Sequence, residues 1–124
     1  MIKQDSSFIV LYSTNITQTH DFYQSIGLDI KEYEDDKVVV EIGSLELHFI
    51  LYSTEPFQEY KYIATPDNYG HGVIFYVETN DIVTDSQLIE QQGGTIKAPI
   101  FENQWGCKEC LFEDPNGYNF ALYQ

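Results

Sequence analysis

The order of secondary-structure patterns in this sequence occurs twice, and that repeat limits the possible folds more than any other feature. In the first half, an apolar run at residues 8–12 has strand character. A helical pattern follows, with Asn15 as its cap and Gly27 as its closing residue. Three β-prone segments come next, at residues 28–33, 37–42 and 46–52, with the turn pair Gly43-Ser44 before the last. The first half therefore predicts the order β-α-β-β-β.

The second half shows the same order of patterns. After an irregular stretch at residues 53–69, residues 72–77 have strand character, and Asp81 can cap a helix that runs through Leu88 and Ile89. The pair Gly93-Gly94 ends that helix. The remaining β-prone segments lie at residues 95–98, 108–112 and 118–123, with an Asp-Pro-Asn-Gly turn at residues 114–117. These patterns predict a second β-α-β-β-β module.

Residue-level matches between the halves support a duplication. Residues 27–31 resemble residues 93–97, and residues 47–52 resemble residues 118–123. The second match predicts that Ile50 and Ala121 occupy the same place in their modules.

Four strands and one helix leave one face of each sheet uncovered, so neither half is expected to be stable alone. The sequence therefore predicts an α+β fold with two βαβββ modules that form curved mixed sheets around a cleft, with the helices on the outer faces. We expect a single domain over residues 1–124, with modules at residues 7–53 and 71–124 and a connecting segment at residues 54–70. Pairing of the modules within one chain and exchange of modules between two chains both remain open.

The charge of the chain excludes some classes of partner. Twenty acidic residues against six basic ones give a formal net charge of −14, which would repel phosphates and anionic lipids. We therefore expect no nucleic-acid or membrane partner, whereas a cationic ligand would be attracted. Residues 1–5 do not open a signal peptide, and no apolar run is long enough to span a bilayer, so a cytoplasmic location is expected.

The two cysteines, Cys107 and Cys110, have the spacing of a CxxC motif. They fall in a run with strand character, where residues three apart point to opposite faces and lie about 10 Å apart, too far for a disulfide. We expect two thiols packed on opposite sides of a strand rather than a redox or zinc site.

Several short motifs together resemble a known family. They are Phe22-Tyr23 before residues 26–28 (Ile-Gly-Leu), residues 70–72 (Gly-His-Gly) and the turn at residues 114–117. This combination resembles the glyoxalase/bleomycin-resistance/dioxygenase superfamily over nearly the whole chain. Residues 34–36, 66–68 and 104–106 are similar in order and approximate spacing to the bleomycin-resistance proteins.

The resemblance implies where a metal site would lie. At the positions that metal-dependent members use, this chain is expected to hold Phe8, Ile50, His71 and Ala121, of which only His71 can bind a metal. A catalytic divalent site needs about three protein ligands. His48 lies two residues before Ile50 and hence on the same strand face, so it is the second metal candidate beside His71. We expect no cofactor. The alternative is a divalent metal such as zinc, nickel, manganese or iron.

The remaining candidates are ligand-binding residues. Trp105, the only tryptophan, stands in a polar segment and matches the tryptophan that lines the drug cleft in the resembled family, and Tyr33 matches a second aromatic position there. Aromatic rings beside carboxylates suit planar or cationic guests. The predicted ligand-binding residues are Trp105, Tyr33, His48, Ile50, Tyr52, Phe57, Tyr60, His71 and Ala121.

The leading hypothesis is a metal-independent protein that sequesters an aromatic or cationic compound, as in antibiotic resistance, and that acts as a homodimer. No catalytic residue is assigned, because no Gly-rich phosphate loop, Gly-x-Ser-x-Gly elbow or evident pair of nucleophile and base is present. The alternative is a metal-dependent lyase, isomerase or dioxygenase of the glyoxalase I type that uses His71, His48 and a carboxylate. A third reading is an interaction domain with no small-molecule role.

Overall fold

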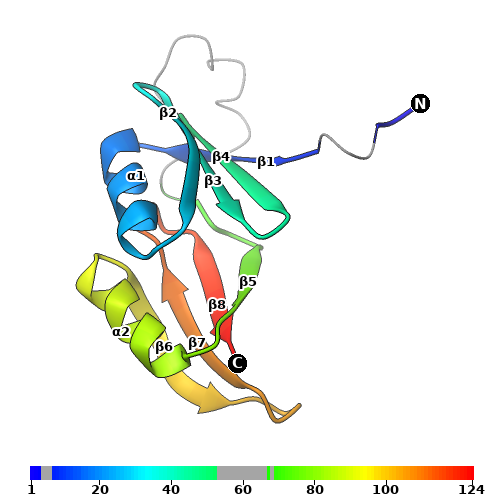
Figure 1. Cartoon of the computed structure of the whole chain (residues 1–124), viewed down its shortest axis with the longest axis vertical. Coiled ribbons are helices and arrows are strands. Elements are labelled where there is room, and N and C mark those ends of the chain that lie inside the picture. The colour runs from blue at the N-terminus through cyan, green and yellow to red at the C-terminus, as the bar shows by residue number, and fades with distance from the viewer. Residues whose placement is uncertain (4–6, 53–66, 68) are drawn as a thin grey trace. The chain divides into compact units, whose positions relative to one another are not determined.

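The chain forms two compact units, Met1–Ile63 and Ala64–Gln124 (Figure 1). The computed structural model describes residues 1–3, 7–52, 67 and 69–124. Each unit contains one four-stranded sheet and one helix, as the repeat in the sequence predicts. No helix in these described ranges has the length and apolarity needed to cross a membrane.

The first unit has the predicted order β-α-β-β-β. Its elements are β1 (Ile9–Ser13), α1 (Ile16–Ser25), β2 (Asp29–Glu34), β3 (Lys37–Ile42) and β4 (Leu45–Leu51). The strands lie in the order β1-β4-β3-β2, with β1 parallel to β4 and the other pairs antiparallel. The parallel pair requires a crossover, which α1 begins.

Helix α1 begins and packs as its sequence dictates. The Asn15 side chain accepts a hydrogen bond from the Gln18 backbone N–H at 3.0 Å, which satisfies one of the free N–H groups of the first turn. The buried residues of α1 form one stripe: Ile16, Thr19, Phe22 and Tyr23. The Tyr23 ring lies 5.2 Å from that of Phe49 in β4, so this stripe covers one face of the sheet.

The second unit repeats this arrangement. Its elements are β5 (Ile74–Glu78), α2 (Ile82–Gln91), β6 (Thr95–Glu102), β7 (Lys108–Glu113) and β8 (Asn119–Tyr123), in the sheet order β5-β8-β7-β6. The rings of Phe75, Phe112 and Phe120 pack together on one face: Phe120 stacks on Phe112 at 5.1 Å and lies tilted against Phe75 at 5.2 Å. Asp81 caps α2 by accepting a hydrogen bond from the Thr84 N–H.

Strand β6 is longer than predicted, since it continues from Thr95 to Glu102 through Pro99. A proline usually ends a strand prediction because it cannot donate to a neighbouring strand. Here β6 is the outer strand of its sheet, and its pairing with β7 shifts register on both sides of Ala98. An outer strand with such irregularities tolerates the missing donor.

Two predicted motifs meet at the entry to the second unit. The Asp114 side chain accepts hydrogen bonds from the backbone N–H groups of Asn116 and Tyr118, which forms the predicted turn. Gly70 lies against this turn with φ +83°, and a Cβ atom there would stand 2.3 Å from the Gly117 carbonyl oxygen. The Asn119 side chain donates to the Gly70 carbonyl at 3.0 Å. Gly70 is therefore required by both its backbone conformation and this close approach.

The structure corrects one of the two matches between the halves. Val10 and Tyr76 stand at equal distances before the helix caps Asn15 and Asp81. Val10 pairs with His48 in β4, whereas Tyr76 pairs with Ala121 in β8.

The counterpart of Ala121 is therefore His48, and the counterpart of Ile50 is Tyr123. The predicted equivalence of Ile50 and Ala121 is wrong by two residues. A slip of two residues leaves every side chain on its predicted face, so the alternating sequence pattern could not reveal the error.

Candidate ligand-binding site

The faces of the two sheets that point away from their helices are the candidate binding surfaces. In β4, Leu47 and Phe49 lie on the helix side, so the alternating residues His48 and Ile50 lie on the other side. We call this side, with Tyr12 and Tyr52, the first open face. The rings of Tyr12 and Tyr52 meet edge to face at 5.6 Å. The structure thus brings together three predicted residues, His48, Ile50 and Tyr52.

His48 has close partners on the first open face. The Phe8 ring stacks on the imidazole with centroids 3.9 Å apart, and Nε2 lies 2.5 Å from the Glu46 carboxylate. Lys31 Nζ lies 3.0 Å from the other oxygen of that carboxylate. The hydrogen bonds from His48 and then Lys31 lower the pKa of Glu46, and Glu46 in turn raises the pKa of Lys31. His48 is therefore part of a polar cluster on this face.

Tyr33 lies on the other side of the first sheet. Its ring stacks on His20 of α1 at 3.9 Å, and its hydroxyl donates to Thr17 Oγ1 at 3.3 Å. It pairs with Val38, which neighbours Val39, the partner of His48. The structure therefore does not bring Tyr33 together with His48 and Ile50.

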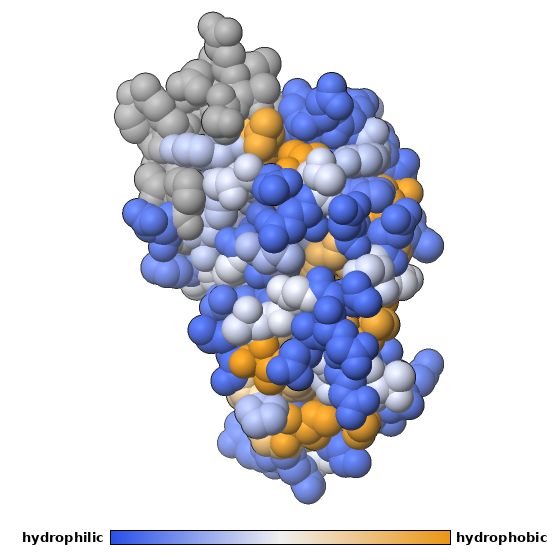
Figure 2. All heavy atoms as spheres, turned by 90° about the vertical axis from the view of Figure 1, so that its left-hand side faces the viewer, coloured by the Kyte–Doolittle hydropathy of each residue, from blue (hydrophilic) through white to orange (hydrophobic). Residues whose placement is uncertain are grey.

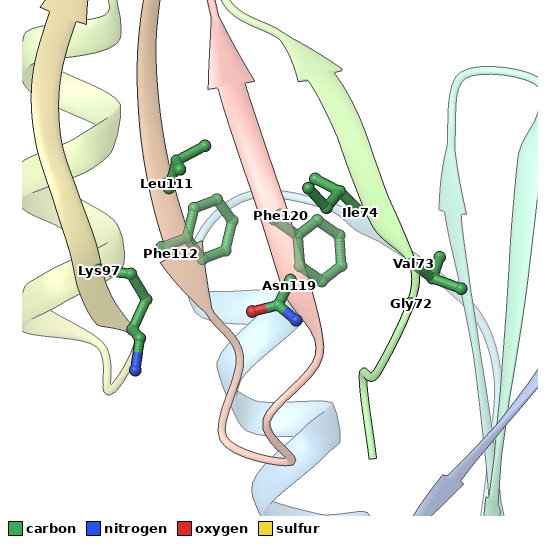
Figure 3. A pocket seen from close by; sticks show the side chains of 8 residues that line it. All are labelled: Gly72, Val73, Ile74, Lys97, Leu111, Phe112, Asn119 and Phe120. Atoms are coloured by element: carbon green, nitrogen blue, oxygen red, sulfur yellow. The ribbon is translucent and has the colours of Figure 1, made fainter. Parts of the chain in front are cut away.

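The second open face lies opposite the packed rings of Phe75, Phe112 and Phe120. Alternation along β5, β7 and β8 defines it by these residues: Ile74, Tyr76, Glu109, Leu111, Asn119, Ala121 and Tyr123. The predicted residue Ala121 is fully buried here. An open pocket of about 480 Å³ lies in this unit (Figure 3) and is lined by Gly72, Val73, Ile74, Lys97, Leu111, Phe112, Asn119 and Phe120.

Lys97 and Asn119 supply the polar groups of this mostly apolar pocket. Lys97 Nζ forms an ion pair with Glu113 at 3.2 Å, and Asn119 is bound to the Gly70 carbonyl. Both groups have partners, so the pocket offers a guest apolar walls and fixed polar rims, as small-molecule sites usually do.

Glu109 is a charged residue of the second open face that the sequence analysis missed. Its side chain is only 4% exposed, and Oε2 accepts a hydrogen bond from Asn103 Nδ2 at 2.8 Å. Oε1 is buried without a hydrogen-bond partner among the described residues. In the sequence, Glu109 is marked only by its place two residues before Leu111, on the same face of a predicted strand. A carboxylate at such a position is also common on solvent-exposed faces, so the sequence could not show that Glu109 is buried.

The Asn103 side chain also organises the turn that carries Trp105. Its Oδ1 accepts from the backbone N–H groups of Trp105 at 2.9 Å and Cys107 at 3.0 Å. Trp105 is 75% exposed, the highest exposure of any aromatic side chain in the described residues. The prediction that Trp105 stands in a loop outside the core is confirmed.

Other predicted residues lie elsewhere. His71 is exposed in the second unit, before β5 begins. Phe57 and Tyr60 fall outside the described residues. Cys107 precedes β7 rather than lying inside it, is half-buried, and like buried Cys110 is a free thiol.

The residues at the implied metal positions do not form a set of metal ligands. If Ala121 marks the position in the second module, the corrected register assigns the matching position to His48, and Phe8 then matches Ile74. Among Phe8, His48, Ile74 and Ala121, only His48 has a side chain that can bind a metal. Within the part of the chain that the structure describes, no three or more His, Cys, Asp and Glu side chains gather closely enough to hold a metal ion. We derive no metal-dependent step from this donor set.

Comparisons with solved structures agree with the fold. A hypothetical protein from S. aureus is 18% identical, with a TM-score of 0.82 over 98% of this chain and 94% of that one. A glyoxalase/bleomycin resistance protein/dioxygenase family enzyme from Burkholderia phytofirmans PsJN is 13% identical, with a TM-score of 0.81 over 94% of this chain and 95% of that one. A bleomycin-binding protein complexed with bleomycin is 19% identical, with a TM-score of 0.65 over 98% of each chain. These likenesses show the fold alone.

A search of curated proteins returned no match. The model of one protein family matches residues 7–122, nearly the whole chain, and it describes the superfamily whose motifs the sequence carries. The chain belongs to the glyoxalase/bleomycin resistance protein/dioxygenase superfamily.

Proposed function

We propose that this protein binds a small aromatic or cationic molecule without the help of a metal ion. The observation that carries the proposal is the open, mostly apolar pocket of the second unit, whose lining includes Ile74, Leu111 and Asn119 of the second open face. The buried carboxylate of Glu109 lies on the same face of β7, two residues from Leu111. Apolar walls with few polar groups favour a largely apolar guest, and exposed rings favour a planar one.

Two further observations support this function over catalysis. The implied metal positions hold one histidine and three side chains that cannot bind a metal, and a catalytic divalent site needs about three protein ligands, which favours a metal-independent function. A structural neighbour described as a bleomycin-binding protein also uses this fold for binding. Sequestration of a drug by binding is the form of the function that we propose.

The proposal includes a homodimer. Large apolar side chains are exposed on β1, the outer strand of the first sheet, at Ile9 and Val10. Exposed apolar side chains on outer strands are typical of surfaces that another chain covers.

The experiment is a titration of metal-stripped protein. The chain is treated with EDTA, its metal content is checked by elemental analysis, and bleomycin and a panel of planar aromatic compounds are added while Trp105 fluorescence and the melting temperature are followed. We expect saturable binding that is unchanged by added nickel, zinc, manganese or iron. Binding that appears only with stoichiometric metal, and is lost in His48→Ala or His71→Ala, would favour the metal-dependent alternative.

A further inference from the structure

The Glu109 carboxylate lacks the partners that a buried charge needs. Burial of an ionised carboxylate is costly unless a cation or several hydrogen bonds compensate for it. Asn103 Nδ2 donates to Glu109 Oε2, and the Tyr76 hydroxyl is a second neutral donor to this carboxylate. No described Lys or His side chain forms an ion pair with it. Its other oxygen, Oε1, is left as an acceptor without a donor. The site is therefore short of one donor, preferably a charged one.

Two tyrosines border this carboxylate. Tyr123 pairs with Glu109 across β7 and β8, and the rings of Tyr123 and Tyr76 lie 6.0 Å apart. Tyr76 is 57% exposed, and the Glu109 carboxylate, as an acceptor and a negative charge, raises the pKa of its hydroxyl. The Tyr76 side chain is the exposed group beside the carboxylate, so a guest can reach Glu109 by taking its place.

A carboxylate next to aromatic rings favours a particular class of guest. A protonated nitrogen donates a charge-assisted hydrogen bond to the carboxylate and is also attracted by the faces of the rings. The net charge of −14 raises the local concentration of cations around the whole chain. A neutral guest of the same shape gains neither the charge-assisted hydrogen bond, nor the cation–π attraction, nor the attraction by the net charge.

We infer that Glu109 receives a protonated nitrogen of the bound molecule, so that the second open face selects organic cations with N–H donors over neutral molecules of the same shape. This inference rests on the proposed function and names its ligand class. Asn103 connects Glu109 to the Trp105 turn: its Nδ2 donates to Glu109 Oε2, and its Oδ1 accepts from the Trp105 backbone N–H. Asn103 is thus a positioning residue that links the backbone of the Trp105 turn to the Glu109 carboxylate.

A matched pair of probes tests the inference. Benzamidine and benzamide have nearly the same planar shape, but only benzamidine is charged at neutral pH. Calorimetric titration of the full chain should give benzamidine at least about tenfold higher affinity, the usual scale for a hydrogen bond to a charged group. Glu109→Gln should remove this preference. Glu90→Gln is the matched control, because it removes the same charge from the exposed side of helix α2, away from the second open face and the pocket.

A measurement on the unaltered protein guards against misfolding of the Glu109 variant. In a two-dimensional amide NMR titration, benzamidine should shift the Asn103 side-chain NH₂ and the Trp105 indole signals, and benzamide should not. Equal affinity for the two probes, or no shift of Asn103 at saturation, would overturn the inference while the proposed function stands on its aromatic ligands. Failure of benzamidine to bind at all would also overturn it, whereas the bleomycin titration tests the proposed function separately.

Discussion

Trp105 is the residue whose structural and functional roles are easiest to separate. Its side chain is 75% exposed, and its backbone N–H is held by Asn103. An exposed ring contributes little to the free energy of unfolding, so an effect of Trp105 on ligand affinity can be measured apart from an effect on stability.

We therefore expect Trp105→Ala to lower the free energy of unfolding by less than about 1 kcal/mol while removing most ligand affinity. Denaturant melts and calorimetric titrations of both proteins measure the two effects. Loss of about 3 to 5 kcal/mol with unchanged affinity would instead identify a core residue. Tyr33→Ala is the comparison: the family resemblance predicts a loss of affinity, whereas its stacking on His20 at the helix side predicts none.

The two cysteines differ in environment, and their reactivity should differ in the same sense. Burial, followed by the negative charge of Glu90, raises the pKa of Cys110, whose side chain is 1% exposed. The thiolate is the reactive form, and a buried thiol with a raised pKa is rarely in that form. Iodoacetamide at pH 8 should alkylate Cys107 first, as read by peptide mass spectrometry. Faster labelling of Cys110 in the native protein would show that β7 opens.

At the scale of elements, the two helices begin with the same device built from different residues. Asn15 caps α1, and Asp81 caps α2. In both units a hydroxyl two residues earlier, on Ser13 or Thr79, accepts a hydrogen bond from the backbone N–H of the capping residue. Asn15→Ala should lower the free energy of unfolding by about 1 kcal/mol in a denaturant melt, independent of pH between 3 and 7. No measurable loss would show that the α1 packing alone holds this turn.

The Asp81 cap should depend on pH. Hydrogen bonds from the backbone and side chain of Thr84 lower the pKa of Asp81 below its ordinary value. A group whose pKa falls on folding stabilises the protein above its unfolded pKa, and this contribution is lost as the pH falls through the folded value. The stability advantage of the unaltered protein over Asp81→Asn should therefore shrink on acidification from pH 6 to 3. A difference that stays constant over that range would contradict the assignment.

At the scale of the whole molecule, charge and exposed apolar strands act in opposite directions. The face seen in Figure 2 is largely hydrophilic with apolar areas between the polar side chains, in keeping with a formal charge of −14. Like charges oppose association, whereas the apolar side chains exposed on β1 favour it.

We expect the protein to be a dimer at micromolar concentration, with association that strengthens as salt screens the repulsion over a Debye length of about 8 Å at physiological ionic strength. Light scattering at several salt concentrations measures this. A mass near 14.4 kDa at all concentrations would show a monomer. Weaker association at high salt would show that ion pairs hold the interface.

Local chemistry made much of the fold predictable. Caps, glycine turns and alternating apolar residues act over a few neighbours, so both helices, the element order and the turn at residues 114–117 could be predicted. The extension of β6 through Pro99 could not, because only its place at the edge of the sheet makes a proline acceptable there.

The sequence by itself determined the family, the repeated modules and the alternation of faces along β4, because these depend on local periodicity and short motifs. Tertiary structure alone decided which residues are partners across strands. It paired Ala121 with Tyr76, which makes His48 rather than Ile50 the counterpart of Ala121 in the first module. It also placed the Tyr33 ring against His20 of α1. It also buried Glu109 with one oxygen lacking a donor. Such partners come from distant parts of the chain, and a two-residue change of register alters them without altering the sequence pattern.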